Sequence, residues 1–254
     1  MSTRLVVVHP DAATLARATA ARLLTRLLDA QSVHSPVHVV LTGGTVGIRT
    51  LAEIAASPLR GAVDWSGVHL WWGDERFLPA GDPDRNETQA RDALLDLLVA
   101  EHGLPAQHVH AMPARGDGPG EASTPEEAAA AYARTLAEHA PRGEHVPDFD
   151  VLLLGMGPDG HVASLFPHHA ALEAPGFTAG VHGSPKPPPE RVTLTFAAIG
   201  AAQEVWVVAA GAEKAAQAAA ALSGGPVTHV PAVRAIGHRR TLWLLDAAAA
   251  SEHR

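Results

Sequence analysis

The sequence predicts an α/β fold built around a mostly parallel central sheet. Short apolar runs alternate along the 254 residues with Ala- and Leu-rich stretches of helical periodicity, which is typical of β–α–β units. The run 149–154 is predominantly apolar, as expected for a central strand that helices cover on both faces. With 46% hydrophobic residues, the chain can bury a large core, and we expect one domain over residues 1–254, with room for a small second lobe.

The first half of the chain alternates strands with helices. The expected elements are, in order, a strand at 4–9, a helix at 11–30, a strand at 37–41, a helix at 46–56, a strand at 68–72, and helices at 88–101 and 125–139. Asp11 can cap the first helix, and the second strand is rich in β-branched residues. Thr124 and Glu127 form a capping box that opens the last of these helices.

The second half continues the same pattern. We expect strands at 149–154, 191–195, 205–209 and 241–245, and a helix at 212–222. Residues 112–123 and the proline-rich stretch 184–189 are expected to be surface loops, because clustered Pro and Gly break regular structure. The alanine run 247–250 is expected to favour helix.

Composition excludes several classes of function. The net charge of −8 argues against a nucleic-acid or membrane partner, because such proteins take most of their affinity from a basic face. The absence of cysteine removes disulfides, thiol nucleophiles and thiolate metal sites. The N-terminal apolar run is only four residues, Leu5 to Val8, and no stretch approaches the ~20 apolar residues of a membrane span. We therefore expect a cytoplasmic protein.

Ligands of open parallel sheets bind beyond the carboxyl ends of the strands, so the residues that follow each strand are candidates for the site. Thr42, Gly43, Gly44 and Thr45 follow the second strand and lead into a helix. Glycines let an anion approach the backbone, and a helix N-terminus offers unpaired N–H groups. This turn is either a phosphate-binding site or an ordinary strand-to-helix turn.

Charged residues follow the third strand. Asp74, Glu75 and Arg76 come directly after it, and Asn86 lies ten residues beyond Arg76. Such a run can be a solvated loop, but its place at a strand end favours a ligand role, since a guanidinium binds phosphate or carboxylate through two contacts.

The most specific stretch follows the strand at 149–154. Glycines flank Asp159 and His161 in the segment Gly-Met-Gly-Pro-Asp-Gly-His. A histidine has a reference pKa of ~6.5 and can accept and return a proton near neutral pH. His161 is therefore a candidate general base, and Asp159 is close enough in sequence to orient its ring or to hold substrate hydroxyls.

Lysine is rare in this chain: of 19 basic residues, only Lys186 and Lys214 are lysines. A lysine that persists can mark a place where a compact ammonium is needed. Lys214 follows the strand at 205–209 in the first turn of the expected helix, where a bound anion would offset the unfavourable helix dipole. Arg191, after the proline-rich loop, is a second candidate for a phosphate ligand. The pairs His108/His110 and His168/His169 match no metal motif, so the histidines are expected to be scattered and no metal is expected.

These segments resemble a known family. The run 73–76 with Asn86, and the block 155–167 around His161, look like the two hallmark motifs of 6-phosphogluconolactonases, the lactonase branch of the glucosamine/galactosamine-6-phosphate isomerase superfamily. The resemblance extends from about residue 5 to residue 245. Arg85 and His168 stand where the family often has Ser and Gly, so the local structure near both is open to change.

The resemblance implies a Rossmann-like, three-layer fold shared with glucosamine-6-phosphate deaminases. It also implies hydrolysis of a phosphorylated sugar lactone without metal or cofactor, with His161 as general base. Arg76, Arg191 and Lys214 would then contact the substrate phosphate or carbonyl. A monomer is the simplest expected state.

Two alternatives remain at this point. A deaminase on the same fold would need a further carboxylate just after the Asp-Gly-His block, and the next acid is Glu173. A non-catalytic sugar-phosphate sensor would bind without turnover, but no basic segment or extra domain for a regulatory partner is evident.

Overall fold

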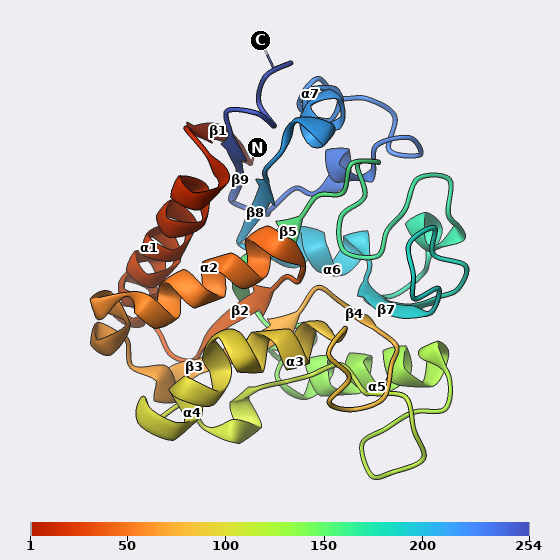
Figure 1. Cartoon of the computed structure of the whole chain (residues 1–254). Coiled ribbons are helices and arrows are strands. Elements are labelled where there is room, and N and C mark those ends of the chain that lie inside the picture. The colour runs from red at the N-terminus through yellow and green to blue at the C-terminus, as the bar shows by residue number, and fades with distance from the viewer. Residues whose placement is uncertain (1, 254) are drawn as a thin grey trace.

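The computed structural model describes residues 2–253 and has three layers, with a six-stranded parallel sheet between two layers of helices (Figure 1). The strand order is β1-β9-β8-β5-β2-β3, and every neighbouring pair is parallel. The strands are β1 (Thr3–His9), β2 (Val37–Leu41), β3 (Val68–Trp72), β5 (Phe149–Gly155), β8 (Glu204–Ala209) and β9 (Arg240–Asp246). All six were expected, and their ends differ from the predictions by at most one residue.

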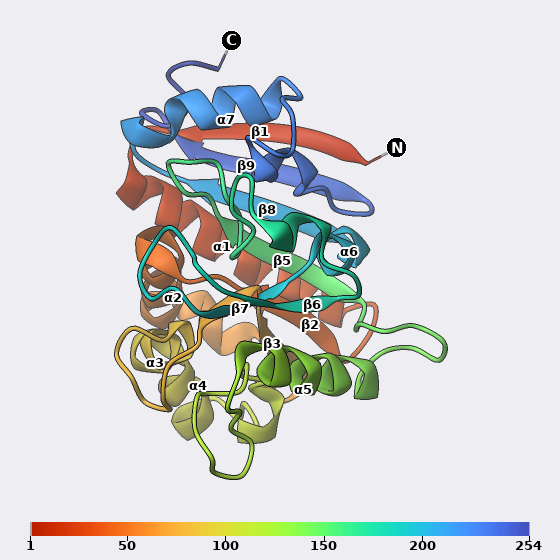
Figure 2. The same ribbon diagram turned by 90° about the vertical axis from the view of Figure 1, so that its right-hand side faces the viewer.

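Helices cover both faces of this sheet. Figure 2 shows α5, α6 and α7 in front of the strands and α1 and α2 behind them. The helices are α1 (Ala12–Gln31), α2 (Gly44–Ala56), α3 (Asn86–Ala90), α4 (Asp96–Glu101), α5 (Pro125–Glu138), α6 (Phe196–Ala201) and α7 (Ala215–Leu222). A π-turn over 91–95 joins α3 to α4. Both predicted caps are confirmed. The side chain of Asp11 accepts a hydrogen bond from the N–H of Thr14, and the side chain of Thr124 accepts one from the N–H of Glu127.

A second, three-stranded antiparallel sheet was not expected. It has the order β4-β7-β6 and consists of β4 (Asp74–Arg76), β7 (Arg191–Leu194) and β6 (Thr178–Val181). The chain crosses from one sheet to the other at Gly73, whose N–H donates to Leu41 in the main sheet and whose carbonyl accepts from Leu194 of β7. The charged run after β3 is therefore a strand and not a loop.

Three local expectations were wrong or incomplete. The helix expected at 212–222 begins as a 3-10 turn, Ala212–Lys214, before α7. The alanine run 247–250 forms a turn, at the start of which the carboxylate of Asp246 accepts from the N–H of Ala249. Helix α6 follows β7 directly and was not predicted.

Candidate active site

A cleft of about 240 Å³ opens at the carboxyl ends of β2 and β5. Successive strands are added outward from these two in opposite directions, so the cleft lies at the topological switch point, where open α/β sheets bind ligands. The cleft is lined by residues 42–47, Asp74, Arg76, Asn86, residues 155–158, His161, Ala163, Lys186, Arg191, Val208 and Lys214. Every residue predicted for the site lies in this lining except Asp159, which contacts His161.

The loop after β5 is a tight turn that fixes the ring of His161. The N–H of Gly157 donates to the carbonyl of His161, and the N–H of Gly160 donates to the carbonyl of Gly157, both at 3.0 Å. A Cβ at Gly157 would lie 2.1 Å from Cε1 of His161, and Gly160 has a φ of +80°. Glycine alone suits both positions, so the glycines of this block determine where the imidazole lies.

His161 and Asp159 form a hydrogen-bonded pair. The distance from Nδ1 of His161 to Oδ1 of Asp159 is 2.5 Å. Burial opposes the ionisation of Asp159, but its hydrogen bond to His161 and the nearby charges of His161 and Lys186 outweigh burial and lower the pKa of Asp159 to about 2. An ionised carboxylate only accepts hydrogen bonds, so Nδ1 carries the proton and Nε2 of a neutral ring is free to accept one.

The N-terminus of α2 forms one wall of the cleft. No side chain caps it, and Gly44 and Thr45 are exposed there, so its first N–H groups can receive an anion. Thr42 has a different role: its Oγ1 accepts from the N–H of Gly155 at 3.0 Å and so links the ends of β2 and β5. The predicted turn therefore divides into a part whose N–H groups are uncapped and a part that links the two strands.

Asn86 stands beside this turn and is held by β4. Its side-chain amide donates to the carbonyl of Asp74 at 2.8 Å, and its backbone N–H donates to Oε1 of Glu75 at 2.6 Å. Its Oδ1 is buried and has no hydrogen-bond partner among the described residues. A Cβ on Gly43 would lie 1.9 Å from this oxygen, so a glycine is required there. Asn86 thus lines the cleft, while its Oδ1 is packed against Gly43.

Behind Asn86 lies a buried ionic network. Burial raises the pKa of Glu75 to about 7, although Arg85 and three backbone N–H groups favour its ionised form. Nη2 of Arg85 lies 3.7 Å from Oε2 of Glu75 and donates to the carbonyl of Met112. Arg85, which stands where the family often has Ser, therefore packs behind Asn86 and is not part of the cleft lining.

His168, which stands where the family often has Gly, has a backbone conformation that glycine favours. His168 has a φ of +58°, in the left-handed region that favours glycine, and its N–H donates to the carbonyl of Thr228. It is outside the cleft lining.

Arg191 is buried beneath the proline-rich loop. Nε donates to the carbonyl of Pro188, and Nη2 donates to those of Lys186 and Pro187, at 3.1–3.2 Å. Its Nη1 lies 4.0 Å from Oδ2 of Asp74, which also accepts from the hydroxyl of Ser164. Most of its N–H donors thus bind carbonyls of this loop, which holds Lys186 in place. Few of its donors remain for a ligand.

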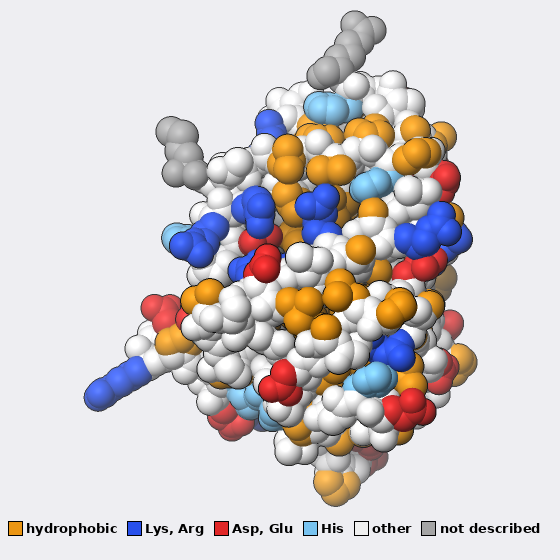
Figure 3. All heavy atoms as spheres, turned by 90° about the vertical axis from the view of Figure 1, so that its left-hand side faces the viewer, with side chains coloured by type: hydrophobic (Ala, Val, Ile, Leu, Met, Phe, Trp, Pro, Cys, Tyr) orange, Lys and Arg blue, Asp and Glu red, His pale blue; other side chains and the backbone are white. Residues whose placement is uncertain are grey.

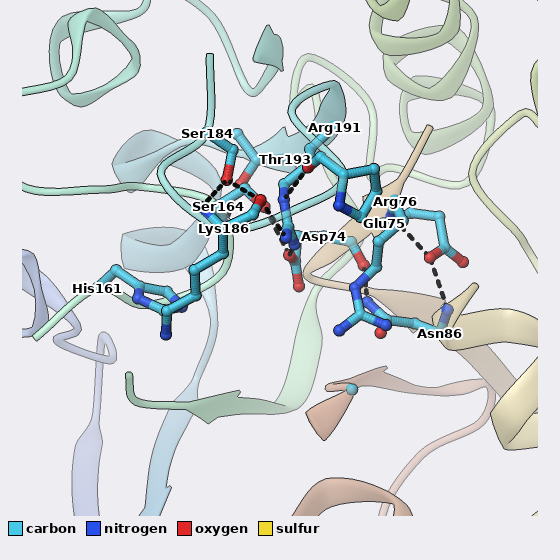
Figure 4. Close-up of polar contacts among 12 residues, drawn as sticks. Asp74, Glu75, Arg76, Asn86, His161, Ser164, Ser184, Lys186, Arg191 and Thr193 are labelled. Atoms are coloured by element: carbon cyan, nitrogen blue, oxygen red, sulfur yellow. Dashed lines mark hydrogen bonds and ion pairs between the residues drawn. The ribbon is translucent and has the colours of Figure 1, made fainter. Parts of the chain in front are cut away.

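Lys186 was not predicted for the site. The loop 184–189 was expected to be a surface loop, yet Lys186 lies beside His161, while Arg76 and Asn86 stand across the cleft (Figure 4). Burial lowers the pKa of Lys186, with the charges of Lys214 and Arg191 adding to this effect and that of Asp159 opposing it. The scarcity of lysine was the one signal that could have identified it.

The cleft is basic in an acidic protein. Its lining has four Lys or Arg residues, Arg76, Lys186, Arg191 and Lys214, and one carboxylate, Asp74, although the whole chain carries a net charge of −8. Arg76 is also tethered, since its Nη1 donates to the carbonyl of Asp84 at 2.5 Å. This arrangement suits an anionic ligand whose reacting group lies near His161.

Comparisons with known proteins show which family this chain belongs to. Residues 10–243 match the family described as glucosamine-6-phosphate isomerases/6-phosphogluconolactonase. The chain is 56% identical to a 6-phosphogluconolactonase of Streptomyces coelicolor over 97% of its length and 94% of the relative's. It is 43% identical to that of Mycobacterium tuberculosis, over 97% of both chains.

Solved structures share the fold. The 6-phosphogluconolactonase of Trypanosoma brucei superimposes with a TM-score of 0.83 at 29% identity and covers 99% of this chain and 98% of its own. A monomeric glucosamine-6-phosphate deaminase superimposes with a TM-score of 0.72 at 17% identity, covering 99% of this chain and 100% of its own, which shows a common fold alone.

Proposed function

Because the chain belongs to the family of glucosamine-6-phosphate isomerases and 6-phosphogluconolactonases, we propose that its cleft hydrolyses 6-phospho-D-glucono-1,5-lactone with His161 as the general base. The product is 6-phosphogluconate, and the reaction is the second step of the oxidative pentose phosphate pathway. The chain is thus a hydrolase that acts on a lactone. The observation that carries the role of His161 is its bond to Asp159, which leaves Nε2 as the ring's acceptor in a cationic cleft.

The proton moves twice in this mechanism. Nε2 of His161 takes a proton from water, and the resulting hydroxide attacks the C1 carbonyl carbon of the lactone. The tetrahedral oxyanion is stabilised by Arg76 or by backbone N–H groups of the cleft. When the bond between C1 and the ring oxygen breaks, the imidazolium returns its proton to that oxygen. Asp159 keeps the ring in the required tautomer throughout.

The substrate phosphate is held apart from the reacting carbonyl. The uncapped N-terminus of α2 at Gly44 and Thr45, together with Lys214 and Lys186, supplies N–H donors and positive charge. Asn86, which lines the same cleft, contacts the sugar beside these groups. These contacts position the lactone and do not themselves transfer protons. A phosphorylated sugar as substrate also supports a cytoplasmic location.

The deaminase alternative has less support. That reaction would need a second carboxylate beside the Asp-Gly-His block. Asp74 is the one carboxylate in the described cleft lining, and it already accepts a hydrogen bond from the hydroxyl of Ser164.

The direct test follows loss of 6-phosphogluconolactone and acid release at constant pH, with the spontaneous rate subtracted. We expect His161→Ala to lower kcat by ~10²–10⁴-fold, the usual contribution of a positioned base, with KM and the circular dichroism spectrum little changed. His253→Ala, an exposed histidine far along the chain, is the matched control. A His161→Ala enzyme with near-normal kcat would remove this residue from the mechanism, and release of ammonia from glucosamine 6-phosphate would favour the deaminase.

A further inference from the structure

A second group of reactive side chains lies at the amino ends of the strands, opposite the cleft. Five histidines gather there: His38 on β2, His69 on β3, His108 and His110 on the segment that bridges to β3, and His139 at the C-cap of α5. The rings of His69 and His108 stack at 3.9 Å between centroids, and those of His110 and His139 lie 4.5 Å apart. The expectation of scattered histidines is wrong for these five, because parallel strand pairing brings them together.

Three of these histidines have ligand atoms in one place. One ring nitrogen each from His69, His110 and His139 lies within 4.8 Å of the other two. Nδ1 of His69 is 2.8 Å from Nε2 of His110, so a single proton lies between two ring nitrogens. A metal ion can replace that proton and bind both. Ligand nitrogens ~2.0–2.1 Å from a tetrahedral zinc are about 3.3 Å apart. This spacing lies between the 2.8 Å that separates the nitrogens of His69 and His110 and the 4.8 Å within which all three nitrogens lie.

The third ligand is already oriented. Nδ1 of His139 lies 2.9 Å from the carbonyl of Thr135, the residue one helical turn earlier in α5. A carbonyl can only accept, so Nδ1 carries the proton and Nε2 keeps its lone pair. Metal-binding histidines usually donate their second ring N–H to such a carbonyl, which fixes both tautomer and orientation.

The surroundings hold the other rings in place and leave a route for an ion. The indole of Trp71 stacks on His110 at 3.8 Å and donates from Nε1 to Nδ1 of His38. His38 and His139 also line a cleft of about 720 Å³ that is separate from the active-site cleft. Solvent ions can therefore reach His139, at the edge of the cluster, through this second cleft.

We propose that His69, His110 and His139 bind one Zn²⁺ ion. Imidazole nitrogens suit zinc and its transition-metal neighbours, whereas Mg²⁺ and Ca²⁺ prefer oxygen ligands. The ion would tie β3, the segment around residue 110 and the end of α5 together, far from the reacting carbonyl. This site goes beyond the proposed lactone hydrolysis and takes no part in it.

The test uses tag-free, chelator-treated full-length protein at about pH 7.5 with Zn²⁺ or Co²⁺ alone. We expect one ion per chain by equilibrium dialysis, visible Co²⁺ absorption bands of a tetrahedral site, a higher Tm with metal, and unchanged lactone hydrolysis. Changing an outer partner of a metal site already costs 10–100-fold in affinity, so His139→Ala, which removes a direct ligand, should weaken binding ~100-fold or more. His253→Ala should bind as the unchanged protein does.

Several outcomes would overturn the proposal. These are no uptake by the unchanged protein, uptake that survives His139→Ala, or uptake that disappears in His161→Ala and so belongs to the active-site cleft. His69→Ala and His110→Ala are secondary tests, because His110 is buried and the ring of His69 stacks on that of His110 within the cluster. His139 is half-buried at a helix end, and its variant keeps the test valid if the others fail to fold.

Discussion

The chemistry of the site depends on one tautomer. A neutral imidazole has one protonated nitrogen and one accepting nitrogen, and its neighbours decide which is which. Here an ionised Asp159 accepts from Nδ1 of His161, so Nε2 is the nitrogen that can take a proton from water. An amide in place of the carboxylate could present its N–H₂ to Nδ1 instead, which would favour the wrong tautomer.

We therefore expect Asp159→Asn to lower kcat by about 100-fold or more, as loss of the carboxylate partner does in other catalytic His–Asp pairs. KM should change little, because Asp159 is outside the cleft lining. Steady-state kinetics on the phosphorylated lactone measure the effect. Asp92→Asn, at an exposed carboxylate of the π-turn, is the control. Equal kcat values for the two variants would contradict the orienting role.

The pH dependence of Asp159 has a definite sign. Its pKa in the folded chain is about 2, below the ordinary 3.8, so its ionisation stabilises the fold above the ordinary value and this contribution is lost as the pH falls toward about 2. Between about pH 5 and 8 it stays ionised. The difference in free energy of unfolding between the unchanged protein and Asp159→Asn should accordingly persist over that range and shrink only as the pH falls from about 4 toward 2 in urea titrations. A difference that declines already between pH 7 and 5 would contradict this assignment.

At the scale of elements, the loop after β5 fixes the position of the His161 ring. Its backbone hydrogen bonds close over residues 157–161, and the ring of His161 occupies the space where a side chain at Gly157 would lie. Similarly, the turn before α2 has room for Asn86 only because residue 43 is glycine. Glycine in these two turns is therefore a requirement of the site geometry and not only of the turn.

This argument gives a matched pair of variants. Gly157→Ala places a methyl group 2.1 Å from Cε1 of His161, whereas Gly61→Ala meets nothing within 4 Å. Displacing a catalytic group by about 1 Å can cost ~10²-fold, so we expect kcat to fall by about that factor in Gly157→Ala and to be unchanged in Gly61→Ala. Thermal unfolding should show both variants folded. Full activity in Gly157→Ala would show that the ring position is not critical.

At the scale of the whole molecule, topology and charge create the site together. The switch between β2 and β5 opens the cleft, the small sheet brings in Asp74 and Arg191, and the loop 184–189 adds Lys186. On the face drawn in Figure 3, basic and acidic side chains are interspersed. In the cleft, by contrast, basic residues outnumber acidic ones. This local positive charge would attract the substrate phosphate although the whole chain carries a net charge of −8.

Such attraction should depend on salt. Inorganic phosphate should inhibit competitively, and its inhibition constant should rise several-fold between about 0.05 and 0.5 M NaCl, since the Debye length falls from more than ~10 Å to less than ~8 Å. The KM of unphosphorylated glucono-1,5-lactone should change far less and is the control. An inhibition constant independent of salt would place the phosphate outside the cationic cleft.

No helix in the described part of the chain is both long and apolar enough to span a bilayer.

Local patterns in the sequence were sufficient for the main framework. The alternation of apolar runs and helical periodicity located all six strands of the central sheet, because apolar residues predominate on strands that helices cover on both faces. The Asp-Gly-His block identified His161 and Asp159, because a tight turn that seats a ring against its own backbone needs glycine at fixed positions.

Contacts between distant segments were decided only by the tertiary structure. The small sheet pairs β4 with β7 across more than a hundred residues, and nothing local in the charged run after β3 indicates a strand. The placement of Lys186 beside His161 depends on this small sheet, whereas the gathering of five histidines depends on the parallel pairing of β2 with β3 and on the bridge between Leu70 and Val109. Such contacts form because burial and backbone hydrogen bonding are satisfied jointly by separate segments, and neither segment alone carries that information.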